Sequence, residues 1–339
     1  MCWTEEFGVL GGGVMDTSFV PPSRGILTEC VRSAVRAPSL HNSQPWLFRI
    51  RRSSIEVHAD LTRGLGVIDP EGRELLISVG AAVFTLRVAL RRAGYDTVEE
   101  LWPEPGDPTL AARVNLTRVV PVDAPTVALA AAIPYRHTNR WPFAQVSVSA
   151  DMLGQLRDAA RREGAVLIAI APAGRDTVLD LAWGADRWLR DQPEYRRELD
   201  RYTDSRLRHD GVPVWAAGPC DALEVVPVRD FAAASPLHRH AEPFEPYPAI
   251  MVLATGYDAP IDWLRAGQAL QRVLLTATWL GLATMPISQP VEVPAVRKAL
   301  ATRVAGLFPQ IVLRVGYGRS QMAGGSPRRS LSEVLMKTG

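Results

Sequence analysis

The residues best suited to chemistry form a ten-residue string between an expected helix and an expected strand. It reads Ala37-Pro38-Ser39-Leu40-His41-Asn42-Ser43-Gln44-Pro45-Trp46 and combines hydroxyl, imidazole and amide side chains. Such a turn can present hydrogen-bond donors and acceptors to the polar edge of a flat ligand. A turn that bonds only its own backbone would explain an isolated Asn-Ser pair, but it does not require the whole string. We therefore interpret the string as part of a binding site.

Three further segments have side chains or backbone groups that suit an anion or a ligand. Arg136-His137-Thr138-Asn139-Arg140 places two guanidiniums, an imidazole and a hydroxyl within five residues, which would suit a phosphate monoester. Gly281 to Pro290 reads as a short proline-bounded loop whose backbone amides could face a ligand, and Gly316-Tyr317-Gly318 is followed ten residues on by Arg328-Arg329. Read alone, each has a plainer interpretation: a solvated basic loop, a helix–strand connection, and a basic tail.

Hydrophobic periodicity predicts the elements that must position these segments. Two long apolar helices, expected over 73–93 and 262–280, are predicted to be central and buried. Thr126 is expected to cap a short helix that ends at Pro134, and Ser149 to cap a helix over 151–162. Further helices are expected over 25–36, 177–190 and 194–208, and strands over 46–50, 54–59, 97–101, 112–120, 165–171, 249–255 and 310–316.

The chain divides into two parts with a similar outline of helix, strand, long buried helix and further strand. We expect a loose tail over 1–24, a first half over 25–120, a linker over 121–133 and a second half over 134–339. Residues 209–248 show no periodicity, and a stretch of that length in a compact domain is typical of a lid, a binding loop or a flexible insertion. The pattern predicts an α+β fold present in two copies.

Composition excludes several classes of protein. The 339 residues are 47% hydrophobic and 22% charged, which argues against wholesale disorder, and a net charge of +2 gives no electrostatic case for nucleic acid as a partner. No apolar run approaches the roughly 20 residues that cross a bilayer, so we expect no membrane partner. Three scattered cysteines and an N-terminus without a signal peptide predict a cytoplasmic location. Only two of the 38 basic residues are lysines, so any anion site must use arginine.

Taken together, the four segments resemble the flavin-dependent nitroreductase superfamily. Its members hold FMN with an R-[RH]-S-x-[RK] segment, a P-S-x-x-N-x-Q-P-W turn, a G-L-x-x-x-P-I loop, and a C-terminal G-Y followed by basic residues. Residues 38–46 look like that turn, 136–140 like the basic segment with Thr in place of Ser, and 281–287 like the loop beside the flavin N5. In that superfamily the site lies at a dimer interface and the turn comes from the other subunit.

The resemblance implies a set of cofactor-binding residues. Arg136 with Arg328 or Arg329 would hold the phosphate, and Arg140 would lie near the flavin N1/C2 edge, where a cation stabilises the negative charge gained on reduction. Side chains of the turn and of Thr138 would bond the ribityl chain or the ring edge, and a backbone N–H of Ser288 or Gln289 would face N5. The full candidate set is Pro38, Ser39, Leu40, Asn42, Gln44, Arg136, His137, Thr138, Arg140, Pro286, Ser288, Gln289, Arg328 and Arg329. We name no catalytic side chain.

The order of the segments implies a fused pseudo-dimer. The first half has the turn without a basic segment, and the second half has the basic segment without a turn, so one flavin site would be built across the halves. This layout is similar to the actinobacterial Acg-like branch, in which a lid over the flavin would be expected in residues 191–248. A monomer would be complete, and a homodimer remains open.

The implied activity is hydride transfer from NAD(P)H through FMN to a small nitro- or quinone-type acceptor. The alternative from another class is a protein that stores FMN under a lid with little turnover. A third hypothesis, a metal hydrolase using His209-Asp210 and His238-Arg239-His240, has weak support because no Glu-rich helix accompanies these residues.

Overall fold

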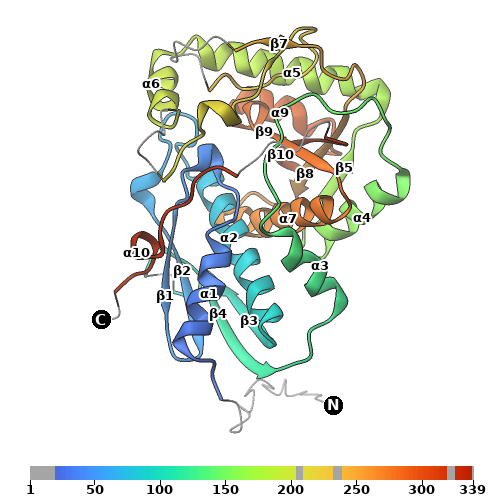
Figure 1. Ribbon diagram of the computed structural model, residues 1–339. Coiled ribbons are helices and arrows are strands. Elements are labelled where there is room, and N and C mark those ends of the chain that lie inside the picture. Colours follow the sequence, from blue (N-terminus) through green and yellow to red (C-terminus); the bar gives the residue numbers. More distant parts are fainter. Residues whose placement is uncertain (1–19, 105, 204–208, 232–238, 319–324, 338–339) are drawn as a thin grey trace, which may run out of the picture.

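Two four-stranded antiparallel sheets flank a pair of long central helices (Figure 1). The computed structural model describes residues 20–104, 106–203, 209–231, 239–318 and 325–337. Most of the expected N-terminal tail lies outside these residues. Mixed helices and antiparallel sheets agree with the predicted α+β class.

The first sheet is built from residues 46–119. Helix α1 (Arg24–Ala34) precedes strands β1 (Trp46–Ile50) and β2 (Ser54–Ala59). The long helix α2 (Arg73–Arg92) follows, and then β3 (Tyr95–Leu101) and β4 (Leu110–Val119) complete the order β1-β2-β4-β3. The predicted elements of this half are confirmed, with boundary shifts of one or two residues.

The second sheet repeats that order with insertions. Its strands are β5 (Val166–Ala169), β8 (Ala249–Thr255), β9 (Ala283–Ile287) and β10 (Phe308–Gly316), arranged β5-β8-β10-β9. When the four strands of each sheet are numbered in chain order, both sheets have the spatial order 1-2-4-3. In both, a long helix follows the second strand: α2 in the first sheet and α7 (Pro260–Trp279) in the second. Other helices of this half include α4 (Ala150–Arg161), α5 (Pro172–Arg190), α6 (Pro193–Arg201), α8 (Gln289–Glu292) and α9 (Pro294–Ala301). Ser149 caps α4 as predicted, since its side chain accepts from Met152 N.

Three local predictions were wrong. The expected loop over 281–290 contains β9, because an edge strand tolerates a proline and Pro286 lies opposite Leu313 of β10. The strand expected over 165–171 is shorter, since β5 spans only Val166–Ala169; it is an edge strand in which Leu167 is buried and Val166 and Ala169 are exposed. Thr126 does not cap α3 (Ala124–Ala132); Asp123 does, by accepting from Thr126 N at 2.8 Å.

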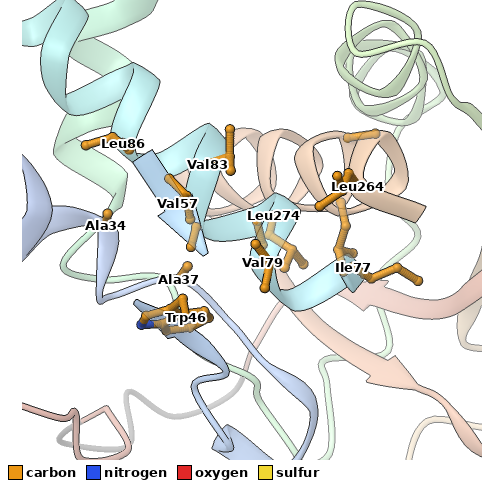
Figure 2. Packing of buried hydrophobic residues seen from close by; sticks show 14 of the residues in the cluster. Ala34, Ala37, Trp46, Val57, Ile77, Val79, Val83, Leu86, Leu264 and Leu274 are labelled. Atoms are coloured by element: carbon orange, nitrogen blue, oxygen red, sulfur yellow. The ribbon is translucent and has the colours of Figure 1, made fainter. Parts of the chain in front are cut away.

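The two central helices approach each other closely enough to require glycine. A Cβ on Gly80 of α2 would collide with the carbonyl oxygen of Leu264, and a Cβ on Gly267 of α7 would collide with that of Ile77. The contact is reciprocal. Gly80 follows Ile77 by three residues on α2, and Gly267 follows Leu264 by three residues on α7. Figure 2 shows buried apolar side chains of both helices, among them Val79 and Val83 of α2 and Leu264 and Leu274 of α7. One continuous core therefore joins the two sheets.

The C-terminal segment crosses from the second sheet to the first. After β10 the chain reaches β1, where Met336 N donates to Phe48 O at 2.8 Å and Leu335 forms a parallel bridge with Phe48 (Figure 1, red segment beside blue β1). The short helix α10 (Leu331–Val334) lies in this segment. The residues after position 325, assigned to the second half from sequence, thus pack against the first.

Residues 209–248, which show no periodicity in the sequence, form little regular structure in their described part. It includes one short 3₁₀ turn (Val214–Ala216) and a two-residue parallel pair, β6 (Cys220–Asp221) with β7 (Ala241–Glu242). Helix α6 ends at Arg201, earlier than the predicted 208, and residues 204–208 lie outside the described part. None of the described helices combines the length and apolarity needed to cross a membrane.

Candidate functional site

The turn after α1 has an unusual backbone. His41, Asn42 and Gln44 have φ of 49°, 56° and 52°, in the left-handed region that residues other than glycine rarely adopt. Ser39 Oγ accepts from Gln44 N at 2.9 Å, so part of the string does bond its own backbone. The rest is fixed from outside: Asn42 Nδ2 donates to Gly211 O at 2.9 Å and to Pro327 O at 3.0 Å. Surrounding structure therefore maintains a conformation that is locally costly.

Two adjoining hollows meet at this turn. The first, here called the inner cavity, lies between α2, β9 and β10; its lining includes Leu40, Glu74, Ser78, Arg229, Phe231, Pro286, Ser288, Gln289 and Gln310. The second, here called the basic pocket, is lined by residues that include Asn42, Arg136, His137, Trp215 and Arg328. Pro38, Ser39, His41, Thr138 and Arg140 line both. The turn and the basic segment, about 100 positions apart in sequence, thus form one continuous site.

The basic pocket holds three guanidiniums and no carboxylate among its described lining residues. Burial lowers the pKa of Arg136 to about 10, and burial together with Arg136 and Arg36 lowers that of Arg328 to about 9. For Arg140, burial with the charges of Arg229 and Arg239 lowers the pKa to about 10. The Nε atoms of Arg136 and Arg328 are buried without a hydrogen-bond partner. A pocket of desolvated, mutually repelling cations is strongly suited to an anion.

His41 is buried at the junction of the two hollows. The residue is 5% exposed, and neither ring nitrogen has a hydrogen-bond partner. Its ring lies edge-on to Phe231, with centroids 5.1 Å apart. Burial, followed by the charges of Arg229 and Arg140, holds the pKa of the imidazole well below its ordinary range. His41 is therefore a neutral imidazole with unused hydrogen-bonding capacity that faces the site.

Residues 209–248, here called the insertion, contribute described lining residues to both hollows. Arg140 donates to Ala216 O at 3.0 Å, and its guanidinium lies 4.9 Å from the ring centroid of Phe231. Arg229 forms a buried ion pair with Glu292 at 2.5 Å and donates to Ser288 Oγ at 3.1 Å. Residues of the insertion thus contact the basic segment at Arg140 and the residues after β9 at Ser288.

Two residues predicted to bind the cofactor line neither hollow. Gln44 Oε1 accepts from Arg329 N at 2.8 Å, and Gln44 Nε2 donates to His209 O at 2.8 Å. The Arg329 side chain donates to the carbonyl oxygens of Gln44 and Trp46 and lies 3.6 Å from Asp60 Oδ2. Both residues fasten the C-terminal segment to the turn. Arg328, by contrast, does line the basic pocket.

The remaining predicted residues are placed around the two hollows. Pro286, Ser288 and Gln289 line the inner cavity, although the Gln289 amide also donates to Asp186 and Pro227 O. His137 is exposed, and its Nδ1 lies 2.9 Å from Tyr135 O. For the metal hypothesis, the described residues contain no group of three or more His, Cys, Asp or Glu placed to hold an ion, and His238 lies outside them.

Relatives of this chain span almost its whole length. The Mycobacterium tuberculosis protein named "Putative NAD(P)H nitroreductase Rv3131" is 35% identical over 331 residues, covering 96% of this chain and 94% of the relative. That species' "Putative NAD(P)H nitroreductase acg" is 30% identical, covering 93% and 97%. The chain belongs to the Acg-like nitroreductase family.

Other comparisons add less. No family model matches the chain. Among solved structures, the FMN-dependent nitroreductase NfnB of Mycobacterium smegmatis aligns with a TM-score of 0.40 and 15% identity, covering 63% of this chain and 99% of that one. At that similarity the match has no bearing on function.

Several site residues of this Acg-like chain escaped sequence reasoning. His41 lies in the turn but is not among the residues predicted to bind the cofactor. Glu74 lies in the helix that the sequence predicts to be apolar on nearly all sides. An acid among the apolar residues of that helix was the available signal. Trp215, Arg229 and Phe231 lie in the region without periodicity, where no signal distinguished them.

Proposed function

We propose that this chain binds FMN across its two halves and passes hydride from NAD(P)H to a small nitro- or quinone-type acceptor. The observation that carries the proposal is the basic pocket, which has three arginines and no carboxylate among its described lining residues and which adjoins the inner cavity at turn residues Pro38, Ser39 and His41. A phosphate monoester attached to a planar ring would occupy both. The family relatives are named putative NAD(P)H nitroreductases, which supports the same activity.

The residues present fit this cofactor. Arg136 and Arg328 would hold the phosphate, since their buried Nε atoms lack partners. Ser39 and Thr138 line both hollows and would bond the ribityl chain, while Asn42 would act through Arg328, to which its Oδ1 is already bonded at 2.9 Å. Backbone N–H groups at Ser288 or Gln289 would face the ring edge. When bound, FMN supplies the two-electron redox chemistry.

The chain's own side chains would shape the reaction. Arg140 supplies positive charge where the two hollows meet, which stabilises negative charge on a bound ring or acceptor. His41 offers a neutral imidazole at the same junction, able to donate from one nitrogen. Phe231 lines the inner cavity and Trp215 lines the basic pocket, and both would limit the access of water to a bound ring.

A pseudo-dimer explains why one chain is sufficient. The proposal is supported by the shared strand order, by the reciprocal Gly80 and Gly267 contacts, and by the C-terminal segment that crosses to β1. Reciprocal contacts are what a two-fold interface produces. We assign residues 25–120 and 134–339 to the two halves, linked by 121–133, with one complete site between them.

FMN storage is the second candidate. It is favoured by the insertion, since Trp215, Arg229 and Phe231 all line the site and would narrow the space left for a hydride donor. In this case residues 191–248 would act as a lid, and the flavin would be held with little turnover.

One experiment separates the two candidates. The purified protein, loaded with FMN, is mixed anaerobically with NADPH or NADH in a stopped-flow spectrophotometer, and a nitroarene is added afterwards. Bleaching of the flavin band within seconds and reoxidation by the nitroarene support the oxidoreductase and exclude storage. No bleaching over minutes supports storage. A colourless protein that cannot be loaded with FMN overturns both.

A further inference from the structure

A single glutamate faces the inner cavity from the first turn of α2. Glu74 is 4% exposed and lies on the cavity wall beside Ser78 and Gln310. It is the one carboxylate among the described residues that line this cavity. Its backbone N–H is bonded to Asp69 Oδ1 at 3.0 Å, which fixes the start of the helix and the position of the side chain.

Four charged side chains act on Glu74, and they come from α2, the segment before it, α8 and the insertion. Arg73, on the same helix, donates to Glu74 Oε1 at 2.5 Å and is itself held by Gln310 O at 2.9 Å. Asp69 precedes the helix, Glu292 lies on α8, and Arg229 comes from the insertion. Burial is the largest influence on the pKa of Glu74, and Glu292 and Asp69 act in the same direction against the two arginines, so the pKa rises to about 8. Near neutral pH the carboxyl therefore retains its proton.

A third hollow, here called the outer cleft, is lined by Arg73, the residue next to Glu74. Its lining includes Asp69, Arg73, Trp188, Glu292, Arg297 and Phe308. Arg73 and Glu292 belong to the outer cleft, while their respective partners Glu74 and Arg229 belong to the inner cavity. The Arg73–Glu74 and Arg229–Glu292 pairs thus form part of the partition between the two hollows, and Arg73, which is bonded to Glu74, also lines the outer cleft.

We propose that Glu74 is the proton donor to an acceptor reduced in the inner cavity, and that it regains its proton from the outer cleft, which its partner Arg73 lines. This role rests on the proposed oxidoreductase function. Pro227, Arg229 and Phe231 line the inner cavity together with Glu74, and a proton donor in the wall would serve an acceptor bound there without a proton from bulk water.

The step balances for both acceptor classes. A hydride brings two electrons and one proton, and the second proton comes from Glu74. In a quinone, hydride and proton give the hydroquinone; in a nitro compound, they give the nitroso product and water. In each case the Glu74 O–H bond breaks and an O–H bond forms on the acceptor, leaving a carboxylate that regains its proton from the outer cleft.

Glu74→Gln tests the proposal, with Glu74→Asp as the conservative variant and Glu29→Gln, an exposed glutamate on α1, as control. In stopped-flow experiments on FMN-loaded protein, E74Q should slow reoxidation by a quinone about 100-fold and change the NADPH step by less than about twofold. E74D should recover part of the loss, and E29Q should match the wild type. The wild-type rate should fall above pH about 8, while the residual E74Q rate should not follow pH there.

A readout independent of turnover is the infrared carbonyl band of a protonated carboxyl. The difference between spectra at pH 6 and pH 10 should lose a component in E74Q that E29Q retains. Equal reoxidation rates and pH profiles in wild type and E74Q, with both variants folded and yellow, overturn the role of Glu74 alone. A wild type that never oxidises an acceptor overturns the proposed function and this role with it.

Discussion

Arg328 donates a hydrogen bond of 2.9 Å from Nη1 to Oδ1 of Asn42, a residue 286 positions earlier in the chain. The same amide donates to Pro327 O in the C-terminal segment and to Gly211 O in the insertion. One side chain therefore joins the turn, the insertion and the tail at the edge of the basic pocket. The pocket is complete only when all three segments are in place, so an anion bound there stabilises them together.

Asn42→Ala should loosen the C-terminal segment. It removes two donor contacts and the acceptor for Arg328, and a lost hydrogen bond to a charged group costs about 1.5–3 kcal/mol. Hydrogen exchange should show faster exchange at Met336 N, whose bond to Phe48 O holds the tail on β1. Asn115→Ala, which loses one surface bond to Glu100, is the control and should leave that amide protected. Unchanged protection in N42A would mean that the tail is held without the amide.

Arg136→Ala should lose FMN. A charge-assisted hydrogen bond contributes about 1.5–3 kcal/mol, so Kd should rise about 10- to 100-fold in a fluorescence-quenching titration. Arg32→Ala, at an exposed arginine paired with Glu29, should bind as the wild type does. Because the Arg136 charge is buried without a partner, Arg136→Met should stabilise the FMN-free protein to urea while weakening its affinity for FMN. Normal flavin occupancy in R136A would place the phosphate elsewhere.

The sequence predicted the scaffold better than the walls of the site. Long periodic helices such as α2 and α7 follow from burial of one continuous apolar surface, and the turn at 38–46 was recognisable because its residue types are uncommon together. Strand β9 was missed because two prolines suggested a loop, and only pairing with β10 makes it a strand. Arg229 and Phe231 could not be found, since their positions depend on tertiary contacts that leave no periodicity.

Gln44 and Arg329 illustrate a second limit. Their residue types fit a cofactor site as well as Ser39 and Arg328 do, and the sequence offers no means of separating them. The direction of each side chain decides: Arg328 faces the basic pocket, whereas Arg329 turns to the carbonyl oxygens of Gln44 and Trp46. Adjacent residues on extended chain point to opposite sides, so one of an arginine pair can bind a ligand while the other secures the backbone.

His41 should make stability fall in mild acid. Its folded-state pKa lies below the ordinary 6.5, so below pH 6.5 the unfolded chain binds a proton that the folded protein does not. Stability is therefore lost as pH falls through 6.5, at about 1.4 kcal/mol per pH unit. Between pH 7 and 5 the unfolding free energy of the wild type should fall about 2 kcal/mol further than that of His41→Gln in urea titrations. His137→Gln, at an exposed histidine, should keep the wild-type slope; a wild-type slope in H41Q would show that His41 titrates normally.

Gly80→Ala and Gly267→Ala should be costly by similar amounts. Each added methyl would meet a backbone carbonyl of the opposite helix, which cannot move away as a side chain can. We expect a loss of about 1–3 kcal/mol for each in urea unfolding. Gly184→Ala in α5 is the control, because its Cβ would meet nothing within 4 Å and alanine favours a helix by about 1 kcal/mol. Wild-type stability in either central variant would show that the two helices are not in close contact in solution.

The chain should bind one FMN as a monomer. The resemblance noted from sequence implies that single-fold members take the turn and the basic segment from different subunits, whereas here both Ser39 and Arg136 line the basic pocket of one chain. Sedimentation velocity followed at the flavin absorbance should give a 37.1 kDa species with one FMN per chain, and dilution should not release the cofactor in step with any dimer dissociation. A homodimer of intact sites would still bind one FMN per chain. Flavin that binds only to a dimer, or two per chain, would contradict a single site formed between the halves.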